Sequence, residues 1–286
     1  MLVKVITYNM GMGVSDRNKK PYLITSKQDA FNTFAHNFSG QYVEEPDGAW
    51  FICVQEIERD NGGKNQVEDM QAELKKRTGV EWWKHSNTRP DSSRDEAVAT
   101  FSTRDLSKVE RYSLPGGRVA LAVKAEVAPG KNVWVVTTHL IKGGDDSGGG
   151  KRKDSIKTLL NHFVNYDATV PIIFCGDLNV TDPTPGTYND MTPDLELFEE
   201  TVGKVQRFGF SRGPGYTPTQ SDITMHAWNT TPDSTGTWSI IDYIQVNGSG
   251  SASARSPEVV NYQVGSGSSV KFASDHKGLY MKIDYL

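Results

Sequence analysis

Six apolar runs in this sequence each end in polar residues of the kinds that enzymes use. A single acid or amide after a strand is ordinary, because Asp and Asn suit the turn that follows. Together, however, the six endings supply four carboxylates, two amides and two imidazoles, which would form an acidic pocket if the strand ends meet in space. The endings are Asn9, Glu56, His139, Asp177-Leu178-Asn179, Asp242-Tyr243 and Ser274-Asp275-His276.

Such a pocket suits the hydrolysis of phosphodiesters. Oxygen ligands such as those of Asn9, Glu56 and Asp275 bind Mg²⁺ or Mn²⁺ and leave room for water and phosphate. Histidine moves a proton near neutral pH, above all when a carboxylate fixes its tautomer. The reaction needs charge neutralisation on the phosphoryl oxygens, an in-line water and a protonated leaving group. These residue types therefore indicate a metal-dependent phosphoesterase.

The same blocks resemble the signature of the endonuclease/exonuclease/phosphatase superfamily, which includes deoxyribonuclease I, AP endonucleases, neutral sphingomyelinases, deadenylases and inositol polyphosphate 5-phosphatases. Each block alone is weak, but they occur in the family's order and span the chain from Asn9 to His276. The resemblance implies an α+β fold, a four-layered α/β sandwich of two mostly antiparallel β-sheets packed face to face and flanked by helices. The blocks are Thr7-Tyr8-Asn9, Gln55-Glu56, Thr138-His139-Leu140, Gly176-Asp177-Leu178-Asn179, Ile241-Asp242-Tyr243 and Ser274-Asp275-His276.

The resemblance implies three metal ligands and two substrate-binding residues. Glu56 resembles the main metal ligand, supported by Asn9 and Asp275, with Mg²⁺ as the expected ion and Mn²⁺ or Ca²⁺ as alternatives. Arg118 stands where the family often has a phosphate-binding arginine, and a surface salt bridge is the alternative. Glu96 stands where deoxyribonuclease-like members have an acid that pairs with the second histidine, and an ordinary solvated carboxylate is its alternative.

The resemblance also implies five catalytic residues. His276 resembles the catalytic histidine, and Asp242 resembles the acid that orients it. Asp177 and Asn179 resemble the pair that places the nucleophilic water and steadies the phosphate. His139 resembles the second histidine, which donates a hydrogen bond to a phosphate oxygen.

Two blocks narrow the expected activity. His139 stands where AP endonucleases typically carry tyrosine, and Asp242-Tyr243 differs from the Asp-Arg of 5-phosphatases. We therefore expect a Mg²⁺-dependent nuclease that cleaves DNA, or RNA in its place, with weak sequence preference, because phosphate contacts carry no base information. The alternative is a phosphatase or a sphingomyelinase-like lipid phosphodiesterase on the same scaffold, acting on an inositol phosphate or a phospholipid. A non-catalytic binding protein is disfavoured, because it would not need the whole set of site residues.

The formal net charge of −4 leaves a nucleic-acid partner open, because contacts can be confined to one face. Two basic groups could follow phosphates beside the site, although ordinary solvated charge explains each of them about equally well. The loop at 226–238 holds two tryptophans that suit either a core or a stacking surface. The basic groups are Arg89, Arg94, Arg104, Arg111 and Arg118, and Lys142, Lys151, Arg152 and Lys153.

The elements that must position these residues follow from hydrophobic periodicity. Apolar residues at helical spacing predict helices over 27–38, 65–78 and 151–166, and Gly79 suits the left-handed end of the second. Strands outnumber helices and no long alternation of the two appears, which favours stacked sheets with helices outside. Alternating or Val- and Ile-rich runs predict strands at Leu2–Asn9, Trp50–Val54, Ala97–Phe101, Val119–Val127, Val133–His139 and Pro171–Cys175.

Glycine- and serine-rich stretches interrupt these elements at 143–150, 247–256 and 265–269. Each lies between segments of similar character, so we expect long surface loops within one domain over residues 1–286 rather than linkers.

Composition bounds the class of protein. Of the 286 residues, 36% are hydrophobic and 10% aromatic, which is ample for a core. The apolar runs are far shorter than the roughly 20 residues of a membrane span, and the N-terminus is a strand without the features of a signal peptide. We therefore expect a cytoplasmic chain or a mature secreted one, acting as a monomer. Cys53 and Cys175 lie in apolar runs and are expected to be buried free thiols, with a disulfide as the less favoured alternative.

Overall fold

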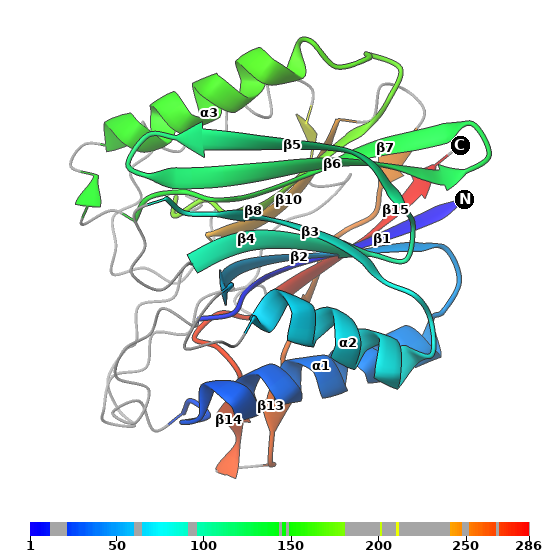
Figure 1. Ribbon diagram of the computed structural model, residues 1–286, viewed down its shortest axis with the longest axis vertical. Helices are drawn as coiled ribbons and strands as arrows, with labels where there is room; N and C mark the ends of the chain where they lie inside the picture. The colour runs from blue at the N-terminus through cyan, green and yellow to red at the C-terminus, as the bar shows by residue number, and fades with distance from the viewer. Residues whose placement is uncertain are drawn as a thin grey trace.

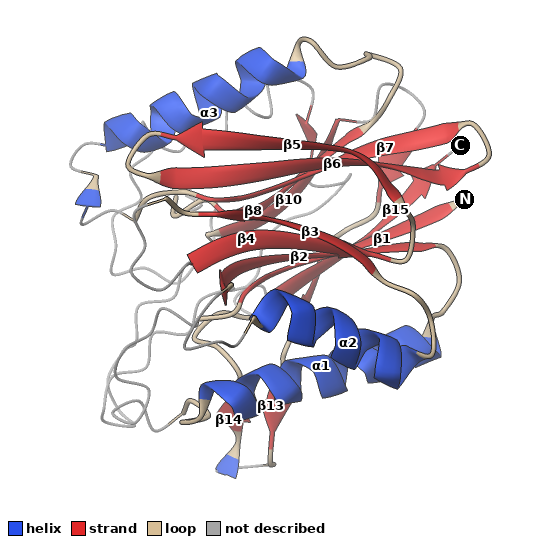
Figure 2. Cartoon of the chain, in the orientation of Figure 1, coloured by secondary structure: helices blue, strands red, loops and turns tan. Residues whose placement is uncertain are grey.

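Two β-sheets pack face to face between helices in the computed structural model of the chain (Figure 1). Figure 2 shows the same arrangement coloured by secondary structure. Arg94 and the tryptophan-containing loop 226–238 lie outside the residues that the structure describes. The described residues are 1–11, 22–59, 65–90, 96–142, 145–146, 149–180, 201, 210–211, 241–247, 252–266 and 269–285.

The first sheet has seven strands in the order β11-β15-β1-β2-β4-β3, with β12 also paired to β15. Its central pair, β1 and β2, runs parallel, while its other pairs are antiparallel. The strands are β1 (Leu2–Asn9), β2 (Ala49–Glu58), β3 (Trp83–Thr88), β4 (Glu96–Ser102), β11 (Ala252–Ala254), β12 (Glu258–Val260) and β15 (Gly278–Tyr285).

The second sheet has six described strands in the order β5-β6-β7-β8-β10-β9, and among these only β7 and β8 pair in parallel. A short antiparallel ribbon of β13 (Gln263–Val264) and β14 (Lys271–Phe272) lies apart. The six strands are β5 (Leu106–Leu114), β6 (Arg118–Ala128), β7 (Lys131–His139), β8 (Ile172–Asp177), β9 (Phe210–Ser211) and β10 (Asp242–Asn247).

Within the described part of the chain three helices cover the outer faces, and two of them are the crossovers that parallel strand pairs require. Helix α1 (Lys27–Glu44) connects β1 to β2, and α3 (Gly150–Phe163) connects β7 to β8. Helix α2 (Gln66–Thr78) begins at Asn65, whose side chain accepts hydrogen bonds from two backbone amides of the first turn, and ends at Gly79 in the left-handed conformation, as predicted. Among the described residues no helix is both long and apolar enough to cross a membrane.

The buried side chains form three apolar clusters, which define four layers. One cluster joins α1 and α2 to the outer face of the first sheet, and it includes Phe34, Phe38 and Trp50. The second fills the space between the sheets. The third joins α3 to the outer face of the second sheet. The four-layered α/β sandwich with mostly antiparallel sheets is therefore confirmed, with few helices on its flanks.

Several element boundaries differ from the prediction. Strands β3 and β5 were not predicted because polar residues fill them: β3 carries intermediate or exposed side chains throughout, and β5 exposes several of its own. Helix α1 extends six residues beyond the predicted end at 38, to Glu44. Strand β11 lies inside the stretch 247–256 that was predicted as a loop, because its small residues still pair with the edge of β15. Both cysteines are buried free thiols, as predicted.

Candidate active site

Strand register alone brings three of the predicted residues into one row. In the second sheet Asp177, at the end of β8, is paired with His139 of parallel β7 and with Asp242 of antiparallel β10. Three residues that are far apart in sequence therefore occupy adjacent positions at one edge of the sheet. Gly176 makes the close approach possible, because at its φ of 142° an added Cβ would overlap the carbonyl oxygen of Thr138.

The Oδ2 atom of Asp177 is the centre of the site. It accepts a hydrogen bond of 3.0 Å from Nδ2 of Asn9, which belongs to the other sheet. The Nε2 atoms of His139 and His276 lie 3.5 Å and 3.9 Å from the same oxygen. Only 2% of Asp177 is exposed, so these contacts are made out of bulk water, where electrostatic interactions are stronger.

Asp242 and His276 lie within hydrogen-bond distance of each other, as predicted. Oδ2 of Asp242 lies 2.8 Å from Nδ1 of His276, which directs Nε2 toward Asp177. Burial alone would lower the pKa of His276, but the charge and hydrogen bond of Asp242, followed by the charges of Asp177 and Asp275, raise it to about 10. In the protein without bound metal, His276 is therefore a cation at neutral pH.

Glu56 occupies an unusual backbone position at the end of β2. The pairing of β2 with β4 shifts register between Val54 and Ile57, and Glu56 within this bulge has a φ of 54°. A bulge re-aims a side chain, and a non-glycine residue in the left-handed region is uncommon enough to indicate a functional position. Nδ2 of Asn9 donates to Oε1 of Glu56 at 3.3 Å, so Asn9 connects this carboxylate to Asp177.

Asp275 borders the same site from the segment that carries His276. A Cβ added at Gly11 would lie 2.9 Å from Oδ1 of Asp275, and the amide of Gly11 donates to Oδ1 of Asn9 at 2.9 Å. The Oγ of Ser274 accepts from the amide of His276 at 3.1 Å, which fixes the turn. Asp275 thus lies beside the Asn9 loop, and it raises the pKa of His276 through its charge.

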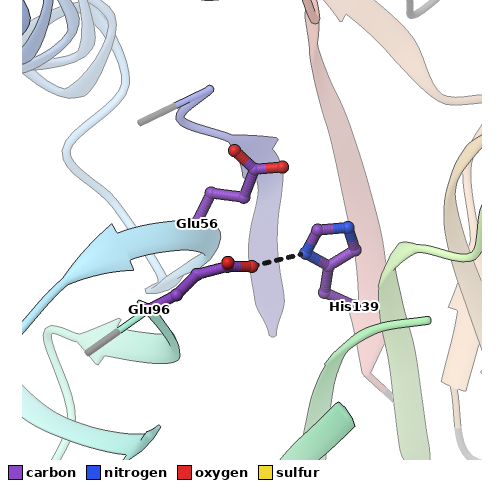
Figure 3. Close-up of side chains that lie close together, drawn as sticks. All are labelled: Glu56, Glu96 and His139. Carbon is purple, nitrogen blue, oxygen red and sulfur yellow. Dashed lines mark ion pairs between the residues drawn. The ribbon is translucent and has the colours of Figure 1, made fainter. Parts of the chain in front are cut away.

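Glu96, His139 and Arg118 form a buried group next to this centre. Oε1 of Glu96 lies 3.5 Å from Nδ1 of His139 and 3.3 Å from Nη1 of Arg118, while Arg118 is itself 3.4 Å from His139. Figure 3 shows Glu96 directed at His139, with Glu56 beside them. Arg118 is 7% exposed and Glu96 is of intermediate burial, so their contact is a partly buried ion pair rather than the surface salt bridge offered as the alternative to a phosphate contact. Glu96 lies beside His139, as the resemblance implies, and its carboxylate is half-buried.

Asn179 follows Asp177 in a tight turn. Its backbone φ is 52°, its amide donates to Oδ1 of Asp177 at 2.9 Å, and its Nδ2 donates to the carbonyl of Leu140 at 2.9 Å. The carbonyl of Asn179 accepts from Nη1 of Arg152 at 2.5 Å. Arg152 was grouped with surface cations in the sequence, yet it is only 6% exposed.

Comparison with protein families decides the relationship. The sequence model described as the Endonuclease/Exonuclease/phosphatase family matches residues 6–276. The chain belongs to this family. It is therefore a metal-dependent phosphoesterase of the endonuclease/exonuclease type. A comparison with curated protein sequences found no match.

Solved structures share the fold of this family member. A family protein from Leptotrichia buccalis C-1013-b has a TM-score of 0.69 at 15% identity, covering 99% of this chain and 100% of that one. D. rerio TDP2 complexed with a single-strand DNA product has a TM-score of 0.63 at 15% identity, covering 99% of each chain. The human Nocturnin catalytic domain with bound sulfate has a TM-score of 0.61 at 16% identity, covering 100% of this chain and 94% of that one.

The residues present fit a divalent cation. Among the described residues, two groups have ligand atoms within 4.8 Å of one another: Glu56, Glu96 and His139, and Asp177, Asp242 and His276. In the second group the Asp242–His276 hydrogen bond already engages Nδ1, so this group works better as a hydrogen-bonded dyad. In the first group Glu96 contacts His139 and Arg118, so Glu56, whose carboxylate is the type of hard oxygen donor that such ions prefer, is the member best suited to hold the ion.

Proposed function

We propose that the chain is a Mg²⁺-dependent nuclease that hydrolyses DNA phosphodiesters with low sequence specificity. The observation that carries this proposal is the convergence of His139, His276 and Asn9 on the single oxygen Oδ2 of Asp177. Two imidazoles and an amide directed at one point supply the donors that a phosphoryl group needs.

Glu56 would hold the cation, with Asn9 and Asp275 beside it. The bound ion would neutralise negative charge on the phosphoryl oxygens. The left-handed backbone of Glu56 fixes where its carboxylate points, and the hydrogen bond from Asn9 restrains it further.

Asp177 is suited to orient the attacking water and to accept its proton, with Asn179 held beside it through the amide-to-Oδ1 hydrogen bond. His276, held as a cation by Asp242, would donate from Nε2 toward the phosphoryl group and give this proton to the leaving oxygen as the P–O bond breaks. His139 donates from Nε2 on the neighbouring side, and its ring is positioned by Glu96 and Arg118 at Nδ1. Each donor is fixed before substrate arrives, so little reorganisation is needed in the transition state.

Basic residues beside the site support a polyanionic substrate. Arg89 and Arg118 lie 3.6 Å and 3.3 Å from the carboxylate of Glu96, so two guanidinium groups surround one acid next to His139. Phosphate contacts position a nucleic acid without reading its bases, which agrees with weak sequence preference. The similar structure of D. rerio TDP2 with a single-strand DNA product also supports a nucleic-acid substrate.

A comparison of substrates tests the proposal. Supercoiled plasmid and single-stranded oligonucleotide should be cleaved in Mg²⁺ and left intact in excess chelator. Parallel assays should measure release of phosphate from inositol phosphates and of phosphocholine from sphingomyelin vesicles. Faster turnover of either of these than of DNA would replace the nuclease with the phosphatase or lipid phosphodiesterase alternative.

A further inference from the structure

The turn that carries Asn179 is held by a residue outside the catalytic set. Asn179 has a φ of 52°, in the left-handed region, which is uncommon for a non-glycine residue although Asn enters it more readily than most. Its amide and its Nδ2 bond to Asp177 and to the carbonyl of Leu140. The backbone carbonyl of Asn179 makes a third contact: it accepts a hydrogen bond from Nη1 of Arg152 at 2.5 Å.

Arg152 is itself fixed by a buried acid. Its Nε donates to Oδ2 of Asp146 at 3.1 Å, and its Nη2 lies 3.5 Å from the carbonyl oxygen of Asp146. Arg152 is 6% exposed and Asp146 is 3% exposed. The guanidinium is therefore held in one place, and its planar set of donors is directed at Asp146 and at the carbonyl of Asn179.

Asp146 in turn is tied to the first turn of α3. Its two carboxylate oxygens accept from the backbone amides of Lys151 and Arg152, each at 3.0 Å. Burial would raise the pKa of Asp146, but these backbone hydrogen bonds and the Arg152 side chain lower it below its usual range, so the acid stays ionised. A continuous set of contacts thus runs from the start of α3 to the turn beside Asp177.

A purely stabilising role explains this arrangement poorly. Replacing a buried ion pair by apolar residues is often neutral or stabilising, because the desolvation cost offsets the attraction. Arg152 instead donates to one carbonyl, two residues after Asp177, in the turn whose amide is hydrogen-bonded to Oδ1 of Asp177. Among the contacts of the described residues, Oδ1 is the polar atom of Asn179 that remains to meet a water or substrate.

We propose that Arg152, held by Asp146, is a positioning residue for phosphodiester hydrolysis: it fixes the left-handed turn that presents Asn179 beside Asp177. This inference rests on the proposed function. Misplacement of a substrate-positioning group by about 1 Å can cost on the order of 100-fold in rate, so loss of Arg152 should act on kcat through Asn179.

The test is a double-mutant cycle on the full chain. Arg152→Met and Asn179→Ala should each lower kcat about 10- to 100-fold with little change in KM, and the double variant should be no slower than Asn179→Ala alone. Arg152→Lys keeps the charge, but its single ammonium group is less able to bond Asp146 and the carbonyl of Asn179 together, so this variant should recover part of the rate. Lys157→Met, which removes an exposed charge from the same helix, should match the wild type. Unchanged kcat in Arg152→Met, or losses in the double variant that multiply, would overturn the proposal.

A readout without turnover separates this proposal from the proposed function. The side-chain amide of Asn179, assigned in a ¹⁵N spectrum by its absence in Asn179→Asp, should show protection from solvent exchange because it donates to Leu140. In Arg152→Met this protection should be lost, and in Lys157→Met it should persist. If Arg152→Met does not fold, Asp146→Asn provides the same comparison with the arginine retained. If the Asn179 amide stays protected in Arg152→Met, or in Asp146→Asn where that variant replaces it, the positioning role is overturned. If the wild-type protein hydrolyses none of the phosphodiesters, only the proposed function is overturned.

Discussion

Oδ2 of Asp242 and Nδ1 of His276 lie 2.8 Å apart, although 34 residues separate them in the chain. Asp242 begins β10, whereas His276 precedes β15 in the other sheet, so the contact joins the two sheets at the site. The pair is nearly closed to solvent, since the two side chains are 0% and 9% exposed. In such surroundings the carboxylate controls both the direction of the imidazole and its charge.

Replacing Asp242 by Asn should therefore lower the pKa of His276 well below its wild-type value. Burial opposes the charged imidazolium, and the variant loses the strongest interaction that holds the pKa at about 10. Titration of the histidine ring by NMR in metal-free protein would measure the change, and Asp105→Asn, an exposed acid, serves as control. Because the folded pKa is raised above the usual 6.5, this pair stabilises the wild type most below pH 6.5 and progressively less as pH rises toward 10. A wild-type His276 that titrates near 6.5 would contradict the pairing.

Replacing Glu56 by Gln should keep the fold and abolish most turnover. The amide is isosteric with the carboxylate but lacks the charge that binds a divalent cation. Isothermal titration with Mg²⁺ or Mn²⁺ should show weakened binding, and circular dichroism should be unchanged. Glu44→Gln, an exposed acid at the end of α1, is the matched control. Full activity of Glu56→Gln, or of the wild type in excess chelator, would remove the metal role from this residue.

Replacing His139 by Ala should lower kcat by roughly 100-fold or more, the range for losing one preorganised donor. His139 ends β7 with 7% of its surface exposed, and its Nε2 is directed at Asp177. His36→Ala, on the exposed face of α1, should have the wild-type rate. A change in KM alone would show that His139 binds substrate without preferentially stabilising the transition state.

Much of this site could be predicted from the sequence because strands place their ends predictably. Asn9, His139 and Asp177 each follow an apolar run, and parallel pairing brings the ends of such runs to one edge of a sheet. The pairing of Asp242 with His276 was implied by the resemblance to the family, and it agrees with the need of a catalytic histidine for a partner at its other nitrogen.

Other features depend on tertiary contacts that leave little trace in the sequence. The bulge at Glu56 arises where the register of β2 and β4 shifts, and β2 contains no glycine from which the bulge could have been predicted. Arg152 stands between two lysines, so its sequence context is that of a surface cation, and only its burial against Asp146 distinguishes it. Strand β3 lacks the alternation that predicts strands, because neither face of it is fully buried.

Replacing Glu96 by Gln should flatten the dependence of stability on acid pH. Burial would raise the pKa of Glu96, but contacts with His139 and two arginines lower it to about 2 from 4.5. A lowered folded pKa stabilises the protein above pH 4.5, and this contribution is lost as pH falls from 4.5 toward 2. Urea unfolding at pH 7 and pH 3 should show that the wild type loses roughly 2 kcal/mol more than Glu96→Gln over this interval. Glu44→Gln, which changes an exposed acid, is the reference variant. If the wild type and Glu96→Gln lose the same free energy of unfolding between pH 7 and pH 3, the carboxylate of Glu96 is not ion-paired in solution.

A single glycine, Gly176, lets β8 approach β7 closely. Gly176 has a φ of 142°, a region that side chains rarely enter, and a Cβ there would overlap the backbone oxygen of Thr138. Because that oxygen belongs to the neighbouring strand, it cannot move aside as a flexible side chain could, and Gly176→Ala should destabilise the fold by about 3 kcal/mol or more. Gly40→Ala is the matched control: a Cβ at Gly40 has nothing within 4 Å, and inside α1 the change should stabilise by roughly 0.5–1 kcal/mol. Urea unfolding measures both. A Gly176→Ala protein as stable as the wild type would show that β7 and β8 do not pair this closely, and the row formed by His139, Asp177 and Asp242 would then lose its structural basis.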